Sequence, residues 1–264
     1  MACIAVFNQK GGVGKTTTAL NLAGAMAHAG QSPLAIDLDP QSHLSAVSGV
    51  TAEAEASVYA FYRDSRSLAA LVQGTSLGWE LIPAHLELSK VDTQYGKGPN
   101  VLNRLRLGIA RDNLNGSLPV VIDCCPVLGV LSLSAIFAAH RVVIPVSTDY
   151  LAVKGAMQVA RTLDALGPVM RRRIERRYVL TRFDGRRKMS WDILETFKAK
   201  FGADLCESRI SENVSIAESP YASKDVFSHA PNSRGAADYA ALFEELTLSG
   251  FLRFGVEPRE SLAA

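Results

Sequence analysis

A short run of lysines, glycines and threonines near the start of the chain has the composition of a phosphate-binding loop. The segment Lys10–Thr17 reads K-G-G-V-G-K-T-T; it follows the apolar run Ile4–Phe7 and leads into a helical pattern that continues to Ala29. A strand, a glycine-rich turn and a helix N-terminus direct backbone N–H groups and the positive end of a helix dipole to one point. In such a loop Lys15 contacts the β- and γ-phosphates, and the Thr16 hydroxyl binds Mg²⁺. The predicted nucleotide-binding residues are Gly11, Gly12, Val13, Gly14, Lys15, Thr16 and Thr17.

The loop departs from the usual pattern at its start. The pattern G-x-x-x-x-G-K-[ST] has a glycine where this chain has Gln9, and Lys10 adds a second cation to a loop that ordinarily carries one. A lysine beside glycines is most often a solvated turn residue. Lys10, however, lies where a bound triphosphate would be, which favours a role at the nucleotide.

Carboxylates follow two further apolar runs. Asp37 and Asp39 end the segment Ala35–Gln41, which reads A-I-D-L-D-P-Q, and Asp123 ends the run Leu118–Asp123. The carboxyl ends of parallel strands face the crevice in which α/β folds bind ligands. Asp-Pro alone is a common turn start, and a strand that ends in aspartate is also common. After a phosphate-binding loop, the second segment has the Walker B arrangement, so Asp123 is a predicted Mg²⁺ ligand.

Apolar runs alternate with helical patterns along the whole chain, which predicts βα units and a single, doubly wound, mostly parallel sheet flanked by helices, the P-loop NTPase fold. The predicted strands are Ala2–Phe7, Pro33–Asp37, Trp79–Ile82, Val120–Asp123, Arg141–Pro145, Tyr178–Thr181 and Asp204–Ser208. The predicted helices are Lys15–Ala29, Pro99–Asn113, Ser132–Ala139, Leu151–Leu166, Ser190–Phe201, Val214–Glu218 and Ser233–Ser249. The segment Val50–Leu77 is poorly periodic and predicts short helices and loops. We expect one domain over residues 1–250 and a C-terminal tail over residues 251–264, frayed from Val256.

Composition and charge narrow the class of protein. The chain has 264 residues, no apolar stretch long enough to span a membrane, and no basic, apolar leader before the first strand. Its four cysteines match no zinc spacing, and Cys124 and Cys125 are adjacent, which indicates reduced thiols in a cytoplasmic protein. Cys125 is either a small apolar residue or one of two vicinal thiols that respond to oxidation.

The net charge of +2 favours no particular partner, but the cations are unevenly distributed. Between Arg171 and Lys188 there are nine lysines or arginines and only two acids, Glu175 and Asp184. Such a cluster is either a solvated face or a surface that binds a phosphate backbone, and the sequence leaves both open.

Taken together, these motifs resemble the ParA/MinD family of deviant Walker A ATPases. The resemblance rests on K-G-G-V-G-K-T at Lys10–Thr16, on D-L-D-P-Q at Asp37–Gln41 and on the Walker B strand, and it covers about residues 2–247. Thr181–Arg186 also resembles the family's T-x-x-D-x-R segment. Because the phosphate-binding loop begins at once, with no helix-turn-helix before it, the chain is most similar to the short, Soj-like ParA type.

The resemblance implies roles for individual residues. Lys10 would cross a dimer interface to the nucleotide of the partner subunit, and Asp39 would position or deprotonate the attacking water. Asp37 would support the network of Mg²⁺ and the loop lysine, in a metal set with Thr16 and Asp123. Thr181 and Ser211 would flank the adenine. The implied cofactors are ATP and Mg²⁺, and the implied state with ATP is a homodimer.

The function that the resemblance implies is ATP-dependent positioning or segregation of a cargo. The cargo would be a plasmid or chromosome partition complex, or a large protein assembly. The dimer would bind nonspecific DNA, and a ParB-like adaptor would stimulate hydrolysis, so the protein would be cytoplasmic and associated with the nucleoid. The DNA-contacting residues would be Arg182, Arg186, Arg187 and Lys188.

Two departures and two alternatives accompany this prediction. Where DNA-binding members carry arginines in and after I-P-R-N, this chain has Glu212 and Ser215, which predicts weaker DNA binding. A MinD-like, membrane-cycling regulator is one alternative, but the C-terminal residues, with Glu257 and Glu260, make a poor membrane helix. A metabolic or electron-transfer P-loop ATPase is the other, although adjacent cysteines suit no interfacial iron–sulfur cluster.

Overall fold

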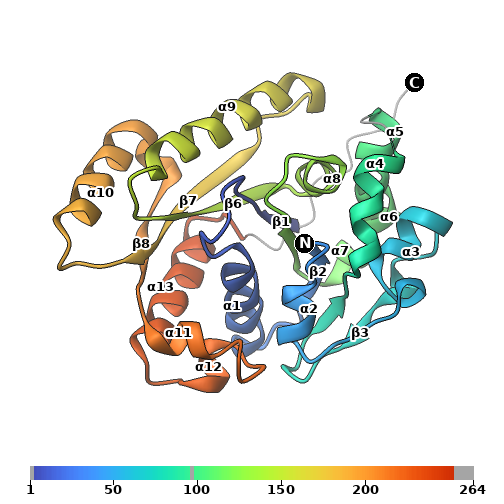
Figure 1. The fold of residues 1–264 in the computed structure, drawn as a ribbon, viewed down its shortest axis with the longest axis horizontal. Helices are drawn as coiled ribbons and strands as arrows, with labels where there is room; N and C mark the ends of the chain where they lie inside the picture. Colours follow the sequence, from blue (N-terminus) through green and yellow to red (C-terminus); the bar gives the residue numbers. More distant parts are fainter. Residues whose placement is uncertain (1–2, 96–97, 253–264) are drawn as a thin grey trace.

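A computed structural model describes residues 3–95 and 98–252 and shows a mostly parallel sheet covered by helices on both faces (Figure 1). Over this part of the chain the strands follow the order β3-β4-β2-β5-β1-β6-β7-β8, and β3 and β4 form the one antiparallel pair. The strands are β1 (Cys3–Val6), β2 (Leu34–Leu38), β3 (Gln73–Gly74), β4 (Glu80–Ile82), β5 (Val120–Cys124), β6 (Arg141–Ser147), β7 (Glu175–Phe183) and β8 (Leu205–Ser211). The predicted fold class is confirmed.

The helices connect the strands and cover both faces of the sheet. The α-helices are α1 (Lys15–His28), α2 (His43–Val47), α3 (Val58–Asp64), α4 (Val91–Gln94), α5 (Pro99–Leu102), α6 (Arg104–Arg111), α7 (Leu114–Ser117), α8 (Val130–Ala138), α9 (Ala152–Met170), α10 (Lys188–Phe201), α11 (Val214–Glu218), α12 (Val226–His229) and α13 (Arg234–Leu248). Short 3₁₀ helices cover Ala54–Ala56, Ala69–Leu71, Leu86–Lys90 and Gly202–Asp204.

Alternating side chains of the central strands enter two separate hydrophobic cores. On β1, Ile4 and Val6 pack with α1 and α13, whereas Cys3 and Ala5 pack on the opposite face with α3, α6, α8, α9 and α10. The residues of β1 are therefore apolar at every position, as expected when helices cover both faces. This sandwich fixes β1, β2 and β5 side by side, with their carboxyl ends at one edge of the sheet.

The seven predicted strands all form, with ends that differ by up to three residues. Strand β3 was not predicted, because two residues carry no periodic pattern and pair only through the neighbouring β4. The segment predicted as one helix over Pro99–Asn113 is instead broken into α5 and α6, and α7 follows after Asn113. The Asn103 side chain donates to the Pro99 carbonyl at 2.9 Å, and Asn113 has φ of 53°, so asparagine side-chain and left-handed backbone geometry interrupt the helix.

The predicted boundary at residue 250 falls before two buried side chains. Phe251 and Leu252 are 2% and 0% exposed and belong to the core beneath α1 and α13. The guanidinium groups of Arg141 and Arg177 also lie over the Phe251 ring, at 5.7 and 5.2 Å from its centroid. The packed structure therefore extends through Leu252, which corrects the start of the tail, and residues 253–264, including the predicted frayed end, lie outside the described residues.

The basic cluster predicted over Arg171–Lys188 is not one surface. Strand β7 runs through its middle, so Arg171–Arg177 lie at the amino end of that strand and Arg182–Lys188 at its carboxyl end. The nearest members of the two groups, Arg177 and Arg182, both lie on this strand, and at about 3.3 Å per residue they are roughly 17 Å apart. Among the described residues, no helix is long and apolar enough to cross a membrane.

Candidate nucleotide-binding site

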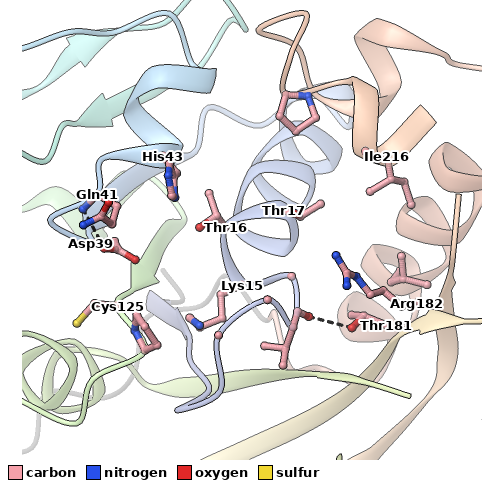
Figure 2. Close-up of a pocket in the computed structure, with 18 of the residues that line it drawn as sticks. Lys15, Thr16, Thr17, Asp39, Gln41, His43, Cys125, Thr181, Arg182 and Ile216 are labelled. Carbon is pink, nitrogen blue, oxygen red and sulfur yellow. Dashed lines mark hydrogen bonds between the residues drawn. The ribbon is translucent and has the colours of Figure 1, made fainter. Parts of the chain in front are cut away.

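A cavity of about 880 Å³ opens above the first turn of α1, at the carboxyl ends of β1, β2, β5, β7 and β8. Figure 2 shows its two sides: Asp39, Gln41, His43 and Cys125 on one side of the α1 N-terminus, and Thr181, Arg182 and Ile216 on the other. All seven predicted loop residues line this cavity, from Gly11 to Thr17, and so do Thr181 and Ser211. The size and the position suit a nucleotide whose phosphates rest on the loop.

Glycine allows the backbone of the loop to turn toward the cavity. Gly12 and Gly14 have φ of 73° and 87°, in the left-handed region, and Gly14 is the N-cap of α1. The loop is fastened to β7, because the Thr181 hydroxyl donates to the Val13 carbonyl at 2.8 Å (Figure 2). This contact uses the Thr181 side chain for support of the loop, and its predicted place beside the adenine stays a prediction.

Lys15 points back at its own loop. Its Nζ donates to the Lys10 carbonyl at 3.0 Å, and the residue is only 7% exposed. Burial lowers the pKa of Lys15, while the charges of Asp123 and Asp39 oppose that shift. A buried ammonium that donates one hydrogen bond to the described residues retains donors for an anion at the loop, in line with its predicted contact to the β- and γ-phosphates.

Asp37 and Asp123 lie opposite each other on the neighbouring strands β2 and β5, and both are 0% exposed. Asp37 is fully engaged: Oδ1 accepts from the Asp39 backbone N–H at 3.0 Å, and Oδ2 accepts from the Ser45 N–H and hydroxyl at 2.9 and 2.7 Å. Burial raises the pKa of Asp37 to about 6, although the Ser45 hydrogen bonds oppose the rise. These contacts favour a supporting role for Asp37 over direct metal ligation.

Asp123 is the unsatisfied carboxylate of the site. Both of its oxygens are buried, and neither accepts a hydrogen bond of ordinary geometry. Burial and the charge of Asp37 raise the pKa of Asp123 well above its usual range, while the Thr16 hydroxyl and the Lys15 ammonium lower it. A buried carboxylate without donors, next to a threonine hydroxyl, fits a Mg²⁺ ion, which prefers hard oxygen ligands. Thr16 and Asp123 are therefore the residues suited to hold the metal.

This unsatisfied charge gives a stability prediction. We expect Asp123→Asn to raise the unfolding free energy of the nucleotide-free protein by ~1–3 kcal/mol, because a neutral amide no longer repels Asp37 or requires a counter-charge. The same variant should lose the stabilisation that ATP and Mg²⁺ give to the wild type. Denaturant unfolding with chelator, and then with ATP and Mg²⁺, measures both effects. Asp225→Asn is the control, because Asp225 is also buried but caps α12 through the Ser228 N–H. Equal stabilisation by both substitutions would contradict the assignment.

Asp39 lies at the rim of the phosphate side. It is 9% exposed, and its Oδ1 accepts from the Gln41 N–H at 3.0 Å, so the turn after β2 holds the carboxylate toward the cavity (Figure 2). His43, at the start of α2, lines the same side and was not predicted. Its position two residues after Gln41 is the signal that could have identified it.

Lys10 does not line its own cavity, unlike the seven residues after it. Its ammonium is ion-paired instead with both carboxylate oxygens of Asp149, on the connection between β6 and α9. Sequence reasoning did not identify Asp149, whose only signal was its position directly after an apolar strand. The structure therefore separates the two loop lysines, with Lys15 inside the cavity and Lys10 outside it.

The side of the cavity that includes Thr181 also includes one residue that the sequence assigned elsewhere. Arg182, predicted as a DNA contact, lines the nucleotide cavity beside Thr181 (Figure 2). Its φ of 50° lies in the left-handed region, which is rare for arginine, and its carbonyl accepts from the Thr148 hydroxyl at 2.8 Å. The Ser211 N–H, at the end of the neighbouring strand β8, donates to Asp238 at 2.8 Å, which fixes the adjoining part of the same wall.

The two adjacent cysteines have different surroundings. Cys124 faces the core, and Cys125 lines the cavity at 4% exposure. Burial raises the pKa of the Cys125 thiol to about 12, so the reactive thiolate is disfavoured. This environment favours the interpretation of Cys125 as a small apolar residue. No group of three or more histidine, cysteine or acidic side chains with metal-binding geometry occurs within residues 3–95 and 98–252.

Comparison with known proteins identifies the family of this chain. A family model described as an AAA domain matches residues 1–175. The chromosome-partitioning ATPase Soj of Thermus thermophilus is 36% identical over 92% of this chain and 94% of its own length. The sporulation initiation inhibitor protein Soj of Bacillus subtilis is 32% identical over 94% and 98%. Among solved structures, cobyrinic acid a,c-diamide synthase of Mycobacterium smegmatis with a bound ATP analogue and magnesium superposes with a TM-score of 0.81, at 27% identity over 95% of this chain and 96% of that one. The chain belongs to the ParA/MinD family of P-loop ATPases.

Proposed function

We propose that this ATPase positions or segregates a cargo through a cycle of ATP-dependent dimerisation, DNA binding and adaptor-stimulated hydrolysis. The observation that carries the proposal is the placement of Lys10. It belongs to the phosphate-binding loop, yet it lies outside its own cavity with a side chain that is 33% exposed. A cation in that place can neutralise the triphosphate of a facing subunit. Two ATP-loaded monomers would need such a cation in order to associate, because their triphosphates repel each other.

The residues of the cavity would have different roles in ATP hydrolysis. Loop N–H groups, the α1 N-terminus and Lys15 would bind the phosphates, and Asp39 would orient or deprotonate the attacking water. Bound Mg²⁺, held by Thr16 and Asp123, would neutralise charge on the phosphates. Asp37 would keep the turn after β2 in place through the Asp39 N–H and Ser45. Little covalent chemistry is required of the protein, because phosphoryl transfer depends mainly on positioning and electrostatics.

DNA binding would use the cations at the carboxyl end of β7, and their surroundings limit its strength. Arg186 and Arg187 both pair with Asp184, at 2.9 and 3.2 Å, and Arg187 also lies 3.6 Å from Glu212. Glu212 occupies a place where the family usually has arginine, so the substitution adds an acid to this surface. A second cavity beside it is lined by four arginines and four acids: Arg186, Arg187, Arg209, Arg234, Asp184, Glu207, Glu212 and Asp238. We therefore propose weak to moderate, salt-sensitive binding.

This proposal predicts the effect of a charge reversal. Arg186→Glu together with Arg187→Glu should abolish ATP-dependent binding of nonspecific duplex DNA, because Asp184 and Glu212 would then repel phosphates without compensation. Filter binding over a salt series is the measurement, with a steep negative slope expected for the wild type. Arg171→Glu with Arg173→Glu is the matched control, since it makes the same charge change at the opposite end of β7. Unchanged binding in the first variant would place the DNA surface elsewhere.

One observation favours the alternative of a metabolic P-loop ATPase: the likeness to the structure of cobyrinic acid a,c-diamide synthase at 27% identity. Partition proteins match at higher identity, including 33% for the ParA of Caulobacter vibrioides over 92% of both chains. The two proposals differ in what stimulates turnover. A partition ATPase should respond to DNA and to an adaptor, whereas an amide-forming enzyme should require its small-molecule acid. ATPase assays with each addition distinguish them.

The adaptor and the cargo would be identified by trapping the ATP-bound state. We propose a ParB-like partner and a protein associated with the nucleoid, without a role for a membrane. A pull-down with the hydrolysis-deficient Asp39→Ala variant in ATP, compared with ADP, should enrich the adaptor only in ATP. Enrichment that does not depend on the nucleotide would contradict the proposed cycle.

A further inference from the structure

The ion pair between Lys10 and Asp149 involves the residue on which the proposed dimer depends. The Asp149 carboxylate contacts the Lys10 ammonium with both oxygens, and it is itself held in place. Its Oδ2 accepts from the Ser147 hydroxyl at 2.6 Å, and its Oδ1 accepts from the Leu151 N–H at 3.1 Å. Lys10 is thus bound to a fixed acceptor on its own subunit.

The main chain around Lys10 is rigid, so the side chain is the part that can move. The Lys10 N–H donates to Asn8 Oδ1 at 3.0 Å, and the buried Asn8 side chain donates to the Pro145 carbonyl at 2.8 Å. In contrast, the side chains of Lys10 and Asp149 are 33% and 43% exposed. The pair lies at the surface beside Tyr150 and Leu151, which are 89% and 51% exposed.

The two loop lysines are also linked to each other. Lys15 donates to the Lys10 carbonyl, while the Lys10 ammonium is bound to Asp149. In this arrangement each lysine of the loop has a protein acceptor where a phosphate oxygen would otherwise be. An anion at Lys15 would replace the first contact within the same subunit, whereas Lys10 would need a second anion from outside its own cavity.

We propose that Asp149 is a positioning residue that competes with the partner's nucleotide for Lys10 and so sets the threshold for ATP-dependent dimerisation. The inference rests on the proposed function, because it requires Lys10 to act across the dimer. The Lys10 side chain must leave Asp149 before it can contact a facing triphosphate. The free energy needed to break the Lys10–Asp149 ion pair therefore opposes dimer formation, and each of the two subunits contributes this cost.

The size of the effect follows from the exposure of the pair. Partly exposed ion pairs contribute little, and each dimer breaks two of them, so Asp149→Asn should lower the dimer dissociation constant by about two- to thirtyfold. Asparagine keeps an acceptor for the Leu151 N–H and removes the charge. The affinity of the monomer for ATP should stay unchanged, because Asp149 does not line the cavity.

The test is sedimentation of the wild type and of four variants with a nonhydrolysable ATP analogue and Mg²⁺. Asp149→Asn should tighten the dimer, and Asp149→Ser, which also retains an acceptor, should do the same. The increase in dimer affinity should vanish in the double variant Lys10→Ala/Asp149→Asn. A purely structural role of Asp149 would not make the effect of Asp149→Asn depend on Lys10 in this way. Asp164→Asn is the matched control, since it removes the charge of an aspartate on α9 that pairs with Arg176 of β7 and lies away from Lys10.

The outcomes separate this inference from the function on which it rests. A wild type that stays monomeric with the analogue overturns both the proposed dimer and the role of Asp149. A wild type that dimerises through Lys10, with Asp149→Asn unchanged or weaker, overturns the role of Asp149 alone. If Asp149→Asn still strengthens the dimer when Lys10 is replaced by alanine, the proposed role of Asp149 is also overturned.

Discussion

Replacement of Asp39 by alanine is expected to leave ATP binding intact, to reduce turnover by at least about a hundredfold, and to accumulate the ATP-bound dimer. The size follows from the contribution of a positioned acid or base to proton transfer, about 10² to 10⁴. The Asp39 carboxylate accepts from the Gln41 N–H at the cavity rim, so its removal leaves the loop N–H groups and Lys15 in place to bind the phosphates. Single-turnover hydrolysis and light scattering with ATP measure the two effects.

Asp39→Asn is the matched control for this result. The amide oxygen can still accept from the Gln41 N–H, so the turn after β2 should keep its shape, but the group can no longer take a proton. We expect Asp39→Asn to fail in hydrolysis nearly as severely as alanine. Retained turnover in the asparagine variant would show that Asp39 only shapes the turn, and a persistent monomer with tight ATP binding would refute its place in the dimer cycle.

Replacement of Lys10 by alanine should have the opposite effect on assembly. ATP binding by the monomer should remain, because Lys15, the loop N–H groups and Mg²⁺ still bind the phosphates. Dimerisation with a nonhydrolysable analogue should weaken at least about thirtyfold, the effect of removing one member of a desolvated charge contact across an interface. DNA binding and stimulated hydrolysis should be lost with it. Sedimentation and nucleotide titration of the same samples separate the two properties.

Lys10→Arg provides a second comparison. Arginine keeps the charge, but its planar fork does not reproduce a compact ammonium in a tight loop, so we expect the variant to fail as well. If Lys10→Ala forms the same dimer as the wild type, the action of Lys10 across the interface is wrong, and the protein should be treated as an ordinary P-loop ATPase.

Features that depend on neighbouring residues could be predicted from the sequence. The phosphate-binding loop is one continuous segment, and its glycines have the left-handed backbone angles that the motif requires. Asp37 and Asp123 each end an apolar strand, and parallel strands bring such ends to one edge of the sheet. The predicted core strands and the fold class were confirmed for the same reason, since hydrophobic periodicity is a local property.

Features that depend on the order and register of the sheet could not be predicted. β7 divides one basic segment into two surfaces, and it carries Arg182 into the nucleotide cavity. Phe251 packs in the core with α1 and α13, and Arg141 of β6 and Arg177 of β7 lie over its ring, contacts that no local pattern around residue 251 indicates.

The contacts that hold the phosphate-binding loop also depend on the order of the strands in the sheet. Thr181 binds the Val13 carbonyl across 168 positions of sequence, and Asp149 binds Lys10 across 139. Neither pair carries a local pattern, because the partners meet only when β6 pairs with β1 and β7 pairs with β6. The sequence by itself determined that this chain has a phosphate-binding loop with a second lysine. Only the tertiary structure decided where that lysine is bound, since an ion pair forms wherever packing brings two opposite charges within reach.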